Sequence, residues 1–487
     1  MPSTPSSPPI ALDPAACYAA LQARDARFDG HWFTGVTSTG VYCRPICRVR
    51  TPKAENCRFF PHAAAAESAG FRPCLKCRPE LAPRTFSVME ASRSLAHAAR
   101  ERLDAAAQHG EAHSLEALAQ ALGVTARHLR RIFAEAFGVS PLAYLQTQRL
   151  LAAKQLLTDT QLPLASVAAQ AGFGSTRAFQ DAWAQQYRLA PLQLRKRASR
   201  TVAPPLTLSY RPPYAVAELM AFLQARAIPG VEDVDPARQR VRRTVRAGAA
   251  IGQLAVAFDA ELPRVRLHLS DALWPHATEL QARVRQWLDL DADPEAIAQR
   301  LTALQPTPGL RLPGGVDRFE LAVRAVLGQQ VTVAAARTVS QRVVQAWGEP
   351  LPEALGLGEG AAWLFPTPQA LAHAQPEAVA ACGMPLRRAQ ALVGLAQAWP
   401  ALRLAQASPQ DPDAAETELL QLAGIGPWTA AYIRMRAWPW PDRFLPGDVV
   451  LRQQLALEPH DPSTFAPYRS YAVLQLWQRA TRAKASP

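Results

Sequence analysis

The sequence has no apolar run long enough to span a membrane, and its cysteines are few and unevenly placed. No apolar stretch approaches the roughly 18–20 residues of a transmembrane helix. The Pro/Ser-rich start MPSTPSSPPI lacks the basic and apolar regions of a secretory signal. We therefore expect a cytoplasmic protein with no membrane partner, whose thiols stay reduced. Only one of the seven cysteines, Cys382, follows residue 77, so any thiolate metal site should lie near the N-terminus.

Acidic residues are the second shortage. The 487-residue chain has 40 Asp and Glu against 53 Lys and Arg, which gives a net charge of +13. This balance favours a polyanionic partner, nucleic acid before a membrane surface, although a basic surface without a partner remains open. The length predicts about three domains, and the 49% hydrophobic content is that of a folded chain.

Changes in composition divide the chain into six segments. They are a disordered tail at 1–12, a Cys- and Arg-rich module at 13–83, an all-α module at 86–198, a linker at 199–206, an α+β module at 207–305 and an all-α module at 306–487. In the α+β module, IGQLAVAF and RVRLHLS predict strands, and AVAELMAFLQARA and HATELQARVRQWLDL predict amphipathic helices. The expected fold class is multidomain and mainly α with α+β parts.

Four cysteines of the second segment have the spacing of a metal site. A C-x3-C pair in GVYCRPICRVR is followed by a C-x2-C pair in FRPCLKCRPE. In a reducing compartment, these pairs predict a tetrahedral Zn²⁺ site, either a structural staple or a reactive centre. The expected ligands are Cys43, Cys47, Cys74 and Cys77. Cys17 and Cys57 stand outside the two pairs and are expected to be buried.

Basic residues surround this site. From Cys43 to Arg78 there are eight Lys and Arg against two Glu, a net charge of +6 before the metal centre is counted. Such a surface should lie on a phosphate backbone. Four thiolates on one Zn²⁺ carry a formal charge of about −2, so a thiolate held against a phosphate is placed to attack an alkyl group on it. The phosphate contacts expected are Arg44, Arg48, Arg50 and Arg72.

The segments GVYCRPICR, ENCRFFPHAAAAESAGFRPC and CLKC resemble the N-terminal domain of the Ada family of methylation-response proteins. The resemblance implies that Cys43 accepts a methyl group from a DNA methylphosphotriester, irreversibly and once per molecule. Methylation would remove one negative charge from the centre and weaken its repulsion of DNA. The sequence PCHR, the active site of the alkylguanine methyltransferase that usually ends Ada proteins, does not occur.

Two helix pairs follow, each with a glycine at its turn. SLEALAQALGVTARHLRRIF turns at Gly123 and ASVAAQAGFGSTRAFQDAW turns at Gly172. In a helix-turn-helix the second helix enters the major groove. The tandem pairs, ending in PLQLRKR, resemble the AraC-type DNA-binding domain, and a helical spacer with solvated arginines is the alternative. The side chains expected to contact DNA are Arg127, Arg130, Arg131, Ser175, Thr176 and Arg177.

From residue 207 to about 480 the chain resembles AlkA-type 3-methyladenine DNA glycosylases of the helix-hairpin-helix superfamily. The resemblance rests on LTLSYRPPY, RLPGGVDRFELAVRAVLGQQVT and ELLQLAGIGPWTAAYIRMRA. Gly424 and Gly426 would join two helices tightly and bring backbone N–H groups to a DNA phosphate. Asp448, in RFLPGDVVLRQQL, could be a helix N-cap only. The resemblance makes it the catalytic carboxylate beside the developing sugar cation.

The same resemblance implies the other site residues. Trp428, Tyr432 and Trp477 would bind a cationic base by cation–π attraction, with core packing as the alternative. Gln330 is the expected wedge that replaces the flipped base, where AlkA-like enzymes can carry Leu, and Thr429 is a further DNA contact. Trp428 stands where lyase relatives carry Lys, so no Schiff base can form there and a monofunctional hydrolase is expected.

The expected protein is therefore an alkylation-damage response protein. A glycosylase for alkylated purines of the 3-methyladenine type would be fused to a zinc-thiolate sensor and a transcription-regulating domain. In the alternative, the N-terminal half only anchors DNA and does not regulate transcription. The expected cofactor is Zn²⁺, and the expected partners are damaged DNA, operator DNA and RNA polymerase. A monomer associated with the nucleoid of a bacterial cytoplasm completes the expectation.

Overall fold

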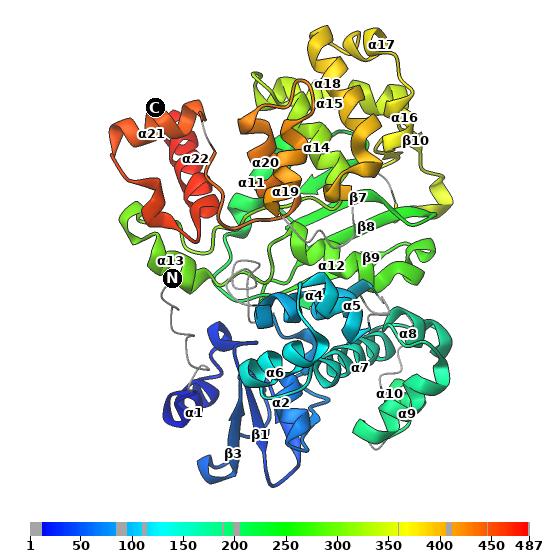
Figure 1. The fold of residues 1–487 in the computed structure, drawn as a ribbon, viewed down its shortest axis with the longest axis vertical. Helices are drawn as coiled ribbons and strands as arrows, with labels where there is room; N and C mark the ends of the chain where they lie inside the picture. The colour runs from blue at the N-terminus through cyan, green and yellow to red at the C-terminus, as the bar shows by residue number, and fades with distance from the viewer. Residues whose placement is uncertain are drawn as a thin grey trace. The chain divides into compact units, whose positions relative to one another are not determined.

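The computed structural model forms two compact units, 1–212 and 213–487 (Figure 1). It describes residues 12–83, 95–109, 114–187, 189–197, 205–358, 360–405, 412–445 and 447–485. The expected tail, except residue 12, and residues 199–204 of the expected linker lie outside these ranges. Among the described residues, no helix is both long and apolar enough to cross a membrane.

The first unit begins with a small sheet and two helices. These are α1 (Pro14–Ala23), β1 (Phe33–Val36), β2 (Val41–Cys43), β3 (Cys57–Phe60), α2 (Ala63–Ser68) and β4 (Arg72–Pro73). The strand order is β3-β1-β2-β4, and only β2 and β4 are parallel. Val41 pairs with Arg72 and Tyr42 with Pro73. Because the two strands run side by side, Cys43 at the end of β2 lies next to Cys74, which follows β4.

In the part of the first unit that follows and that the structure describes, helices are joined by one strand. It contains α4 (Leu95–His109), α5 (Leu115–Ala121), α6 (Ala126–Phe137), α7 (Pro141–Asp159), α8 (Leu164–Gln170), α9 (Thr176–Tyr187), α10 (Pro191–Arg197) and β5 (Leu206–Ser209). Gly123 between α5 and α6 has φ 68°, and Gly172 between α8 and α9 has φ 79°. Glycine adopts this left-handed conformation without strain, and both expected helix-turn-helix pairs are present.

Buried polar bonds join the small sheet to α7. The Glu67 carboxylate accepts hydrogen bonds from the hydroxyls of Tyr42 and Thr147, both at 2.9 Å. Glu80, just after the second cysteine pair, forms a buried ion pair with Lys154 of α7 at 2.5 Å. The Cys-rich segment and the helical segment therefore pack as one unit.

The second unit opens with an α+β layer. It consists of α11 (Val216–Arg226), β6 (Glu232–Asp235), β7 (Arg240–Ala247), β8 (Ala250–Phe258), β9 (Arg264–Leu269), α12 (Ala277–Trp287) and α13 (Pro294–Arg300). Strands β6 to β9 pair antiparallel in chain order. The strands expected from IGQLAVAF and RVRLHLS are confirmed as β8 and β9, and the two expected amphipathic helices as α11 and α12.

Helices form the remainder of the second unit. They are α14 (Arg318–Leu327), α15 (Val333–Trp347), α16 (Pro368–Ala372), α17 (Pro376–Ala380), α18 (Leu386–Ala398), α19 (Pro412–Leu420), α20 (Pro427–Ala437), α21 (Val449–Leu457) and α22 (Arg469–Ala485), with a short hairpin of β10 (Glu349–Pro350) and β11 (Trp363–Leu364). α14 packs against both α18 and α20 around one apolar core (Figure 1). The expected multidomain, mainly α fold with α+β parts is confirmed.

A buried ion cluster ties the α+β layer to the helices. Arg243 of β7 pairs with Glu232 at 2.9 Å and with Glu320 of α14 at 2.5 Å. Arg324 of α14 pairs with the same two carboxylates, at 2.7 and 2.5 Å. Removing one partner from such a cluster leaves a buried charge uncompensated, at a cost of about 3–5 kcal/mol.

Candidate functional sites

The four cysteines predicted as ligands converge. The sulfurs of Cys43, Cys47, Cys74 and Cys77 all lie within 4.8 Å of one another. Sulfurs around a tetrahedral Zn²⁺ are separated by about 3.8 Å for Zn–S bonds of about 2.3 Å, so this cluster fits the ion. The backbone N–H groups of Arg44 and Lys76 point at the sulfurs of Cys77 and Cys74, at 3.3 and 3.4 Å. These donors stabilise thiolates.

The arginines around the cluster divide into two groups. The side chain of Arg44 is only 4% exposed. Its Nε donates to Asp29 Oδ1 at 2.8 Å and its Nη1 donates to the carbonyl of Cys77 at 3.1 Å. This burial favours a structural role for Arg44 in place of the expected phosphate contact. Arg48, Arg50 and Arg72 are exposed and accessible to a phosphate.

The two other cysteines of the Cys-rich segment differ in burial. Cys17 is buried, as expected. Cys57 is only half-buried on β3, and its thiol donates to the carbonyl of Lys53 at 3.4 Å. The expectation of a buried Cys57 is therefore wrong, because β3 is an edge strand of the sheet.

The second helix of each helix-turn-helix exposes a polar face. On α6, Arg127, Arg130 and Arg131 are exposed, while Leu129 and Phe133 on the opposite face are buried. Such a helix leaves its basic face free for a groove.

On α9, Arg177 is exposed and Thr176 is half-buried. The hydroxyl of Ser175 accepts a hydrogen bond from the backbone N–H of Ala178 at 3.1 Å, so Ser175 caps the helix. A serine at the helix N-terminus can still meet a DNA phosphate with its backbone N–H.

One cavity of about 710 Å³ in the second unit holds the predicted pocket residues. Asp448, Trp428, Tyr432 and Trp477 all line it. The rings of Trp428 and Tyr432 stack with centroids 5.1 Å apart and planes 12° apart. The ring of Trp477 lies 6.3 Å from that of Tyr432. The structure therefore brings Asp448, at the start of α21, to an aromatic wall formed by α20 and α22.

Asp448 is both a helix cap and a carboxylate of this cavity. Its Oδ1 accepts from the N–H of Leu451 at 2.9 Å, which caps α21. Its Oδ2 accepts from the indole N–H of Trp428 at 2.9 Å, and Oδ1 accepts from that of Trp477 at 3.3 Å. Asp448 is 9% exposed. Three directional donors thus hold one carboxylate at the cavity wall.

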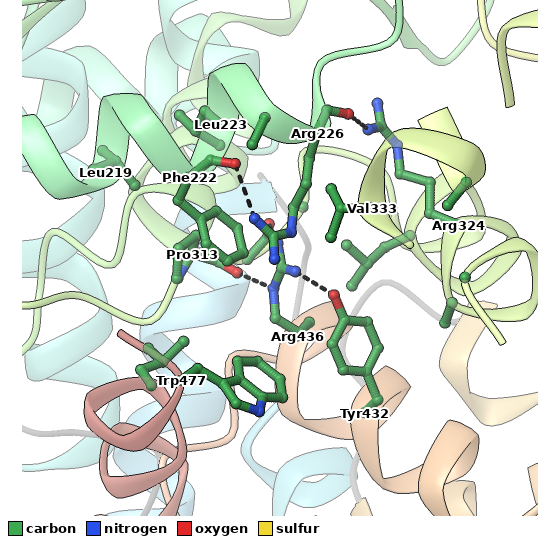
Figure 2. A pocket seen from close by; sticks show the side chains of 18 of the residues that line it. Leu219, Phe222, Leu223, Arg226, Pro313, Arg324, Val333, Tyr432, Arg436 and Trp477 are labelled. Atoms are coloured by element: carbon green, nitrogen blue, oxygen red, sulfur yellow. Dashed lines mark hydrogen bonds between the residues drawn. The ribbon is translucent and has the colours of Figure 1, made fainter. Parts of the chain in front are cut away.

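Sequence reasoning missed the opposite wall of the cavity, which Figure 2 shows. The guanidinium of Arg226 on α11 lies 3.7 Å from the ring centroid of Phe222. Arg436 donates a hydrogen bond to the hydroxyl of Tyr432 at 2.5 Å. Burial alone would raise the pKa of Tyr432, but the charges of Arg436 and Arg226 outweigh it and lower the pKa. The helical periodicity of α11 predicted only an amphipathic helix, so no local signal showed that Phe222 and Arg226 line a cavity.

The hairpin between α19 and α20 offers free backbone donors. Within the described residues, no hydrogen-bond partner is found for the N–H groups of Gly424 and Gly426. Gly424 has φ 82°, and a Cβ there would lie 2.6 Å from the Cβ of Ala391. Close packing on α18 therefore requires glycine at this position.

The two other DNA contacts expected near the hairpin differ in exposure. Thr429 is only 4% exposed, and its hydroxyl accepts a hydrogen bond from Gln329 at 3.0 Å. This placement favours an anchoring role for Thr429 in place of the expected DNA contact. Gln330, the expected wedge, is exposed and has φ 54°.

Four family models match successive parts of the chain. The metal binding domain of Ada matches residues 16–80 and a helix-turn-helix domain matches residues 118–197. The AlkA N-terminal domain matches residues 205–317. The HhH-GPD superfamily of base excision DNA repair proteins matches residues 323–456. The match to the Ada domain and the four clustered sulfurs together support Zn²⁺ as the metal.

Curated relatives cover both parts and the whole. The chain is 39% identical to DNA-3-methyladenine glycosylase 2 of Escherichia coli, over 56% of this chain and 96% of that one. It is 32% identical to the bifunctional transcriptional activator/DNA repair enzyme Ada of the same species, over 33% of this chain and 43% of that one. A probable bifunctional transcriptional activator/DNA repair enzyme AlkA of Mycobacterium tuberculosis is 37% identical over 95% of both chains. The chain therefore belongs to the family of bifunctional AlkA proteins, which join the Ada metal-binding and helix-turn-helix domains to a DNA glycosylase.

Proposed function

We propose that the second unit hydrolyses the N-glycosidic bond of alkylated purines in duplex DNA, with Asp448 as the catalytic carboxylate. The observation that carries this proposal is the single cavity in which Asp448, held by two indole N–H groups, faces stacked aromatic rings. A flipped-out base needs such a stacking pocket, and the sugar it leaves needs an adjacent anion.

The chemistry follows from the substrate. A purine alkylated at N3 or N7 carries positive charge, so it departs with the bonding electron pair without a strong acid. The Asp448 carboxylate stabilises the positive charge that develops on the sugar. A water molecule then adds to the sugar carbon and passes its proton to Asp448. The hairpin helix presents Trp428 to the cavity and no lysine, which supports a hydrolase without lyase activity.

Replacement of Asp448 by asparagine tests this role. An asparagine side chain can keep the cap on α21 because its oxygen still accepts from Leu451, but the negative charge is lost. We expect Asp448→Asn to lower the single-turnover release of 7-methylguanine from duplex DNA by roughly 100-fold. The matched control is Asp293→Asn, because Asp293 caps α13 outside the cavity. Release by Asp448→Asn at the wild-type rate would contradict the assignment.

For the first unit we propose that Cys43 accepts a methyl group from a DNA methylphosphotriester. Bound Zn²⁺ would keep the four cysteines deprotonated. The Cys43 thiolate attacks the methyl carbon, a C–S bond forms, and the phosphodiester leaves with the C–O bonding electrons. The observation that supports this is the cysteine cluster beside exposed Arg48, Arg50 and Arg72. The cluster loses one negative charge in the reaction, so binding to DNA should strengthen.

The two expected alternatives, a transcription-regulating N-terminal half and one that only anchors DNA, differ in whether methylation changes promoter binding. We propose that the methylated chain, as a monomer in the cytoplasm, binds a promoter operator more tightly through α6 and α9 and from there contacts RNA polymerase. Affinity for that DNA is measured before and after incubation with methylphosphotriester DNA, with Cys43→Ala as the control. Equal affinity in a fully methylated sample would instead support a glycosylase whose N-terminal half only anchors DNA.

A further inference from the structure

The loop between α14 and α15 (residues 328–332) carries the expected wedge. Gln330 in this loop is exposed and has φ 54°, a left-handed conformation that residues other than glycine rarely adopt. Val331 is also exposed, and Gly328 and Val331 line the same cavity as Asp448. A strained loop keeps its shape only where surrounding bonds hold it.

The side chain of Gln329 supplies two of those bonds. Its amide nitrogen donates to the carbonyl of Gly424 at 3.0 Å and to the hydroxyl of Thr429 at 3.0 Å. The backbone carbonyl of Gln329 accepts from the guanidinium of Arg388 on α18 at 2.5 Å. One side chain therefore bonds the wedge loop to the hairpin turn and to the first turn of α20.

The chemistry of this bridge requires a primary amide. The Gly424 atom that meets Gln329 is its carbonyl oxygen, an acceptor, so the partner must be a donor, and the hydroxyl of Thr429 receives the second N–H of the same group. A glutamate offers no donor at neutral pH, and a leucine of similar size offers none at any pH. An asparagine is one methylene shorter than the span that the glutamine bridges.

The bridge also joins two surfaces that must act together on DNA. The hairpin presents the N–H groups of Gly424 and Gly426, for which no partner is found among the described residues. The loop carries Gln330, the expected wedge, at an exposed position. Because Gln329 bonds to the carbonyl of Gly424 itself, it fixes the wedge relative to the turn that would hold the phosphate.

We propose that Gln329 is a positioning residue for base flipping, which holds the Gln330 wedge in register with the phosphate-binding hairpin. The inference rests on the proposed glycosylase function of the second unit. Gln329 acts through Gln330 and the hairpin, so its loss should slow extrusion of the base and leave the contact of the hairpin with undamaged DNA unchanged. A direct DNA contact by Gln329 is the competing explanation.

Two measurements on the full chain separate these explanations. The first is the dissociation constant for an undamaged duplex, and the second is the single-turnover release of 7-methylguanine from the same sequence at saturating protein. For Gln329→Leu we expect release to fall at least tenfold while the dissociation constant stays within twofold. Gln345→Leu, at an exposed position of α15, is the matched control and should behave as wild type.

Thr429→Val provides a second, independent variant because it removes one acceptor of the bridge. We expect a smaller loss than for Gln329→Leu, and a double variant no slower than Gln329→Leu alone, since both changes break the same bridge. If Gln329→Leu does not fold, the base release and the DNA affinity of Thr429→Val test the proposal instead.

Three results would overturn the proposal. They are release by Gln329→Leu within twofold of wild type, a parallel loss of affinity for undamaged DNA, and additive effects in the double variant. Failure of the underlying function looks different, because the wild-type chain would then release no base. In that case, fluorescence of 2-aminopurine placed beside a tetrahydrofuran abasic site still reports whether Gln329→Leu impairs extrusion.

Discussion

At the scale of single residues, the orientation of one carboxylate organises the cavity. Asp448 Oδ2 has one donor, the indole of Trp428 at 2.9 Å, whereas Oδ1 has the Leu451 N–H at 2.9 Å and the more distant indole of Trp477 at 3.3 Å. The two indoles are therefore unequal, and the carboxylate depends more on Trp428 for its position.

Substitution of each indole by a phenyl ring tests this inequality. Trp428→Phe keeps an aromatic ring against Tyr432 but removes the donor to Oδ2. A hydrogen bond to a charged group contributes about 1.5–3 kcal/mol, so we expect single-turnover base release to fall at least tenfold. Trp477→Phe should cost less, because its bond is longer and Oδ1 keeps Leu451. Equal losses in the two variants would show that ring packing, and not the donor, matters.

Glu67 predicts a pH dependence of stability. Burial raises its pKa to about 7, although hydrogen bonds from Thr147 and Tyr42 and the charge of Lys154 lower it. In the unfolded chain a glutamate titrates at about pH 4.3, so between these values the folded chain holds a proton that the unfolded chain has lost. The free energy of unfolding should therefore fall as pH rises through this window.

Glu67→Gln removes this titration and keeps groups that can bond to both hydroxyls. The free energy of unfolding of wild type should fall by about 1 kcal/mol from pH 6 to pH 8, whereas that of the variant should not show this fall. Thermal unfolding of both chains at the two pH values measures the difference. If the free energy of unfolding changed equally with pH in both chains, the raised pKa of Glu67 would be contradicted.

The sequence located residues whose neighbours form a contiguous motif, such as Asp448 and the four cysteines. It did not reveal that Arg44 and Thr429 are buried against other side chains, because burial and partners depend on distant parts of the chain. Arg44 is neutralised by Asp29, 15 residues earlier, and Thr429 bonds to Gln329, 100 residues earlier. A basic or hydroxyl side chain in a DNA-binding motif gives no sign of such a partner.

At the scale of elements, the hairpin between α19 and α20 combines two glycines with different reasons for being glycine. Gly424 has φ 82° and packs against Ala391, whereas Gly426 has an ordinary negative φ, and a Cβ added there would have no neighbour within 4 Å. The first glycine serves the fold, and the open space at the second is available to a phosphate.

This difference predicts opposite phenotypes. Gly424→Ala should lower the stability of the second unit by about 1–3 kcal/mol, because it combines strain at positive φ with a clash. Gly426→Ala should melt near wild type but bind duplex DNA several-fold more weakly, since a methyl group obstructs the phosphate. Thermal unfolding and DNA titration of both variants give the comparison, and unchanged DNA affinity for Gly426→Ala would place the phosphate elsewhere.

Elements differed in how well the sequence predicted them. The helix-turn-helix pairs and strands β8 and β9 were predictable, because apolar periodicity extends over many residues between clear turns. The sheet around the cysteines was not, since its strands are two to four residues long. Its parallel pairing of β2 with β4 joins segments 31 residues apart.

At the scale of the whole molecule, two compact units each carry one candidate site. The cysteine cluster packs with α7 inside the first unit through the Glu80–Lys154 and Glu67–Thr147 contacts. The aromatic cavity lies entirely in the second unit. The sequence predicted the cysteine cluster and the residues of the cavity, but the buried charges that join segments within each unit have no local signature.

Because the two sites lie in separate units, we expect base release to be independent of the metal site. Removal of the metal tests this expectation. A small sheet with few core residues depends on its metal for stability, so chelation should unfold the cysteine-rich part and destabilise the helices packed on it. Base release by the second unit should stay within about twofold, because none of the described residues of the first unit lines its cavity. Far-ultraviolet circular dichroism and base release are measured on the same chelated sample. A parallel loss of base release would show that the two chemistries are not independent.

The most direct test of the whole account is one reaction of the full chain with methylated duplex DNA, in which modified peptides and released bases are both identified by mass spectrometry. The account predicts one methyl group on Cys43 and on no other cysteine, with more than one methylated purine released per chain. Asp448→Asn should lower the release roughly 100-fold and keep the methyl transfer. A methyl group on a different cysteine, or undiminished release by Asp448→Asn, would contradict it.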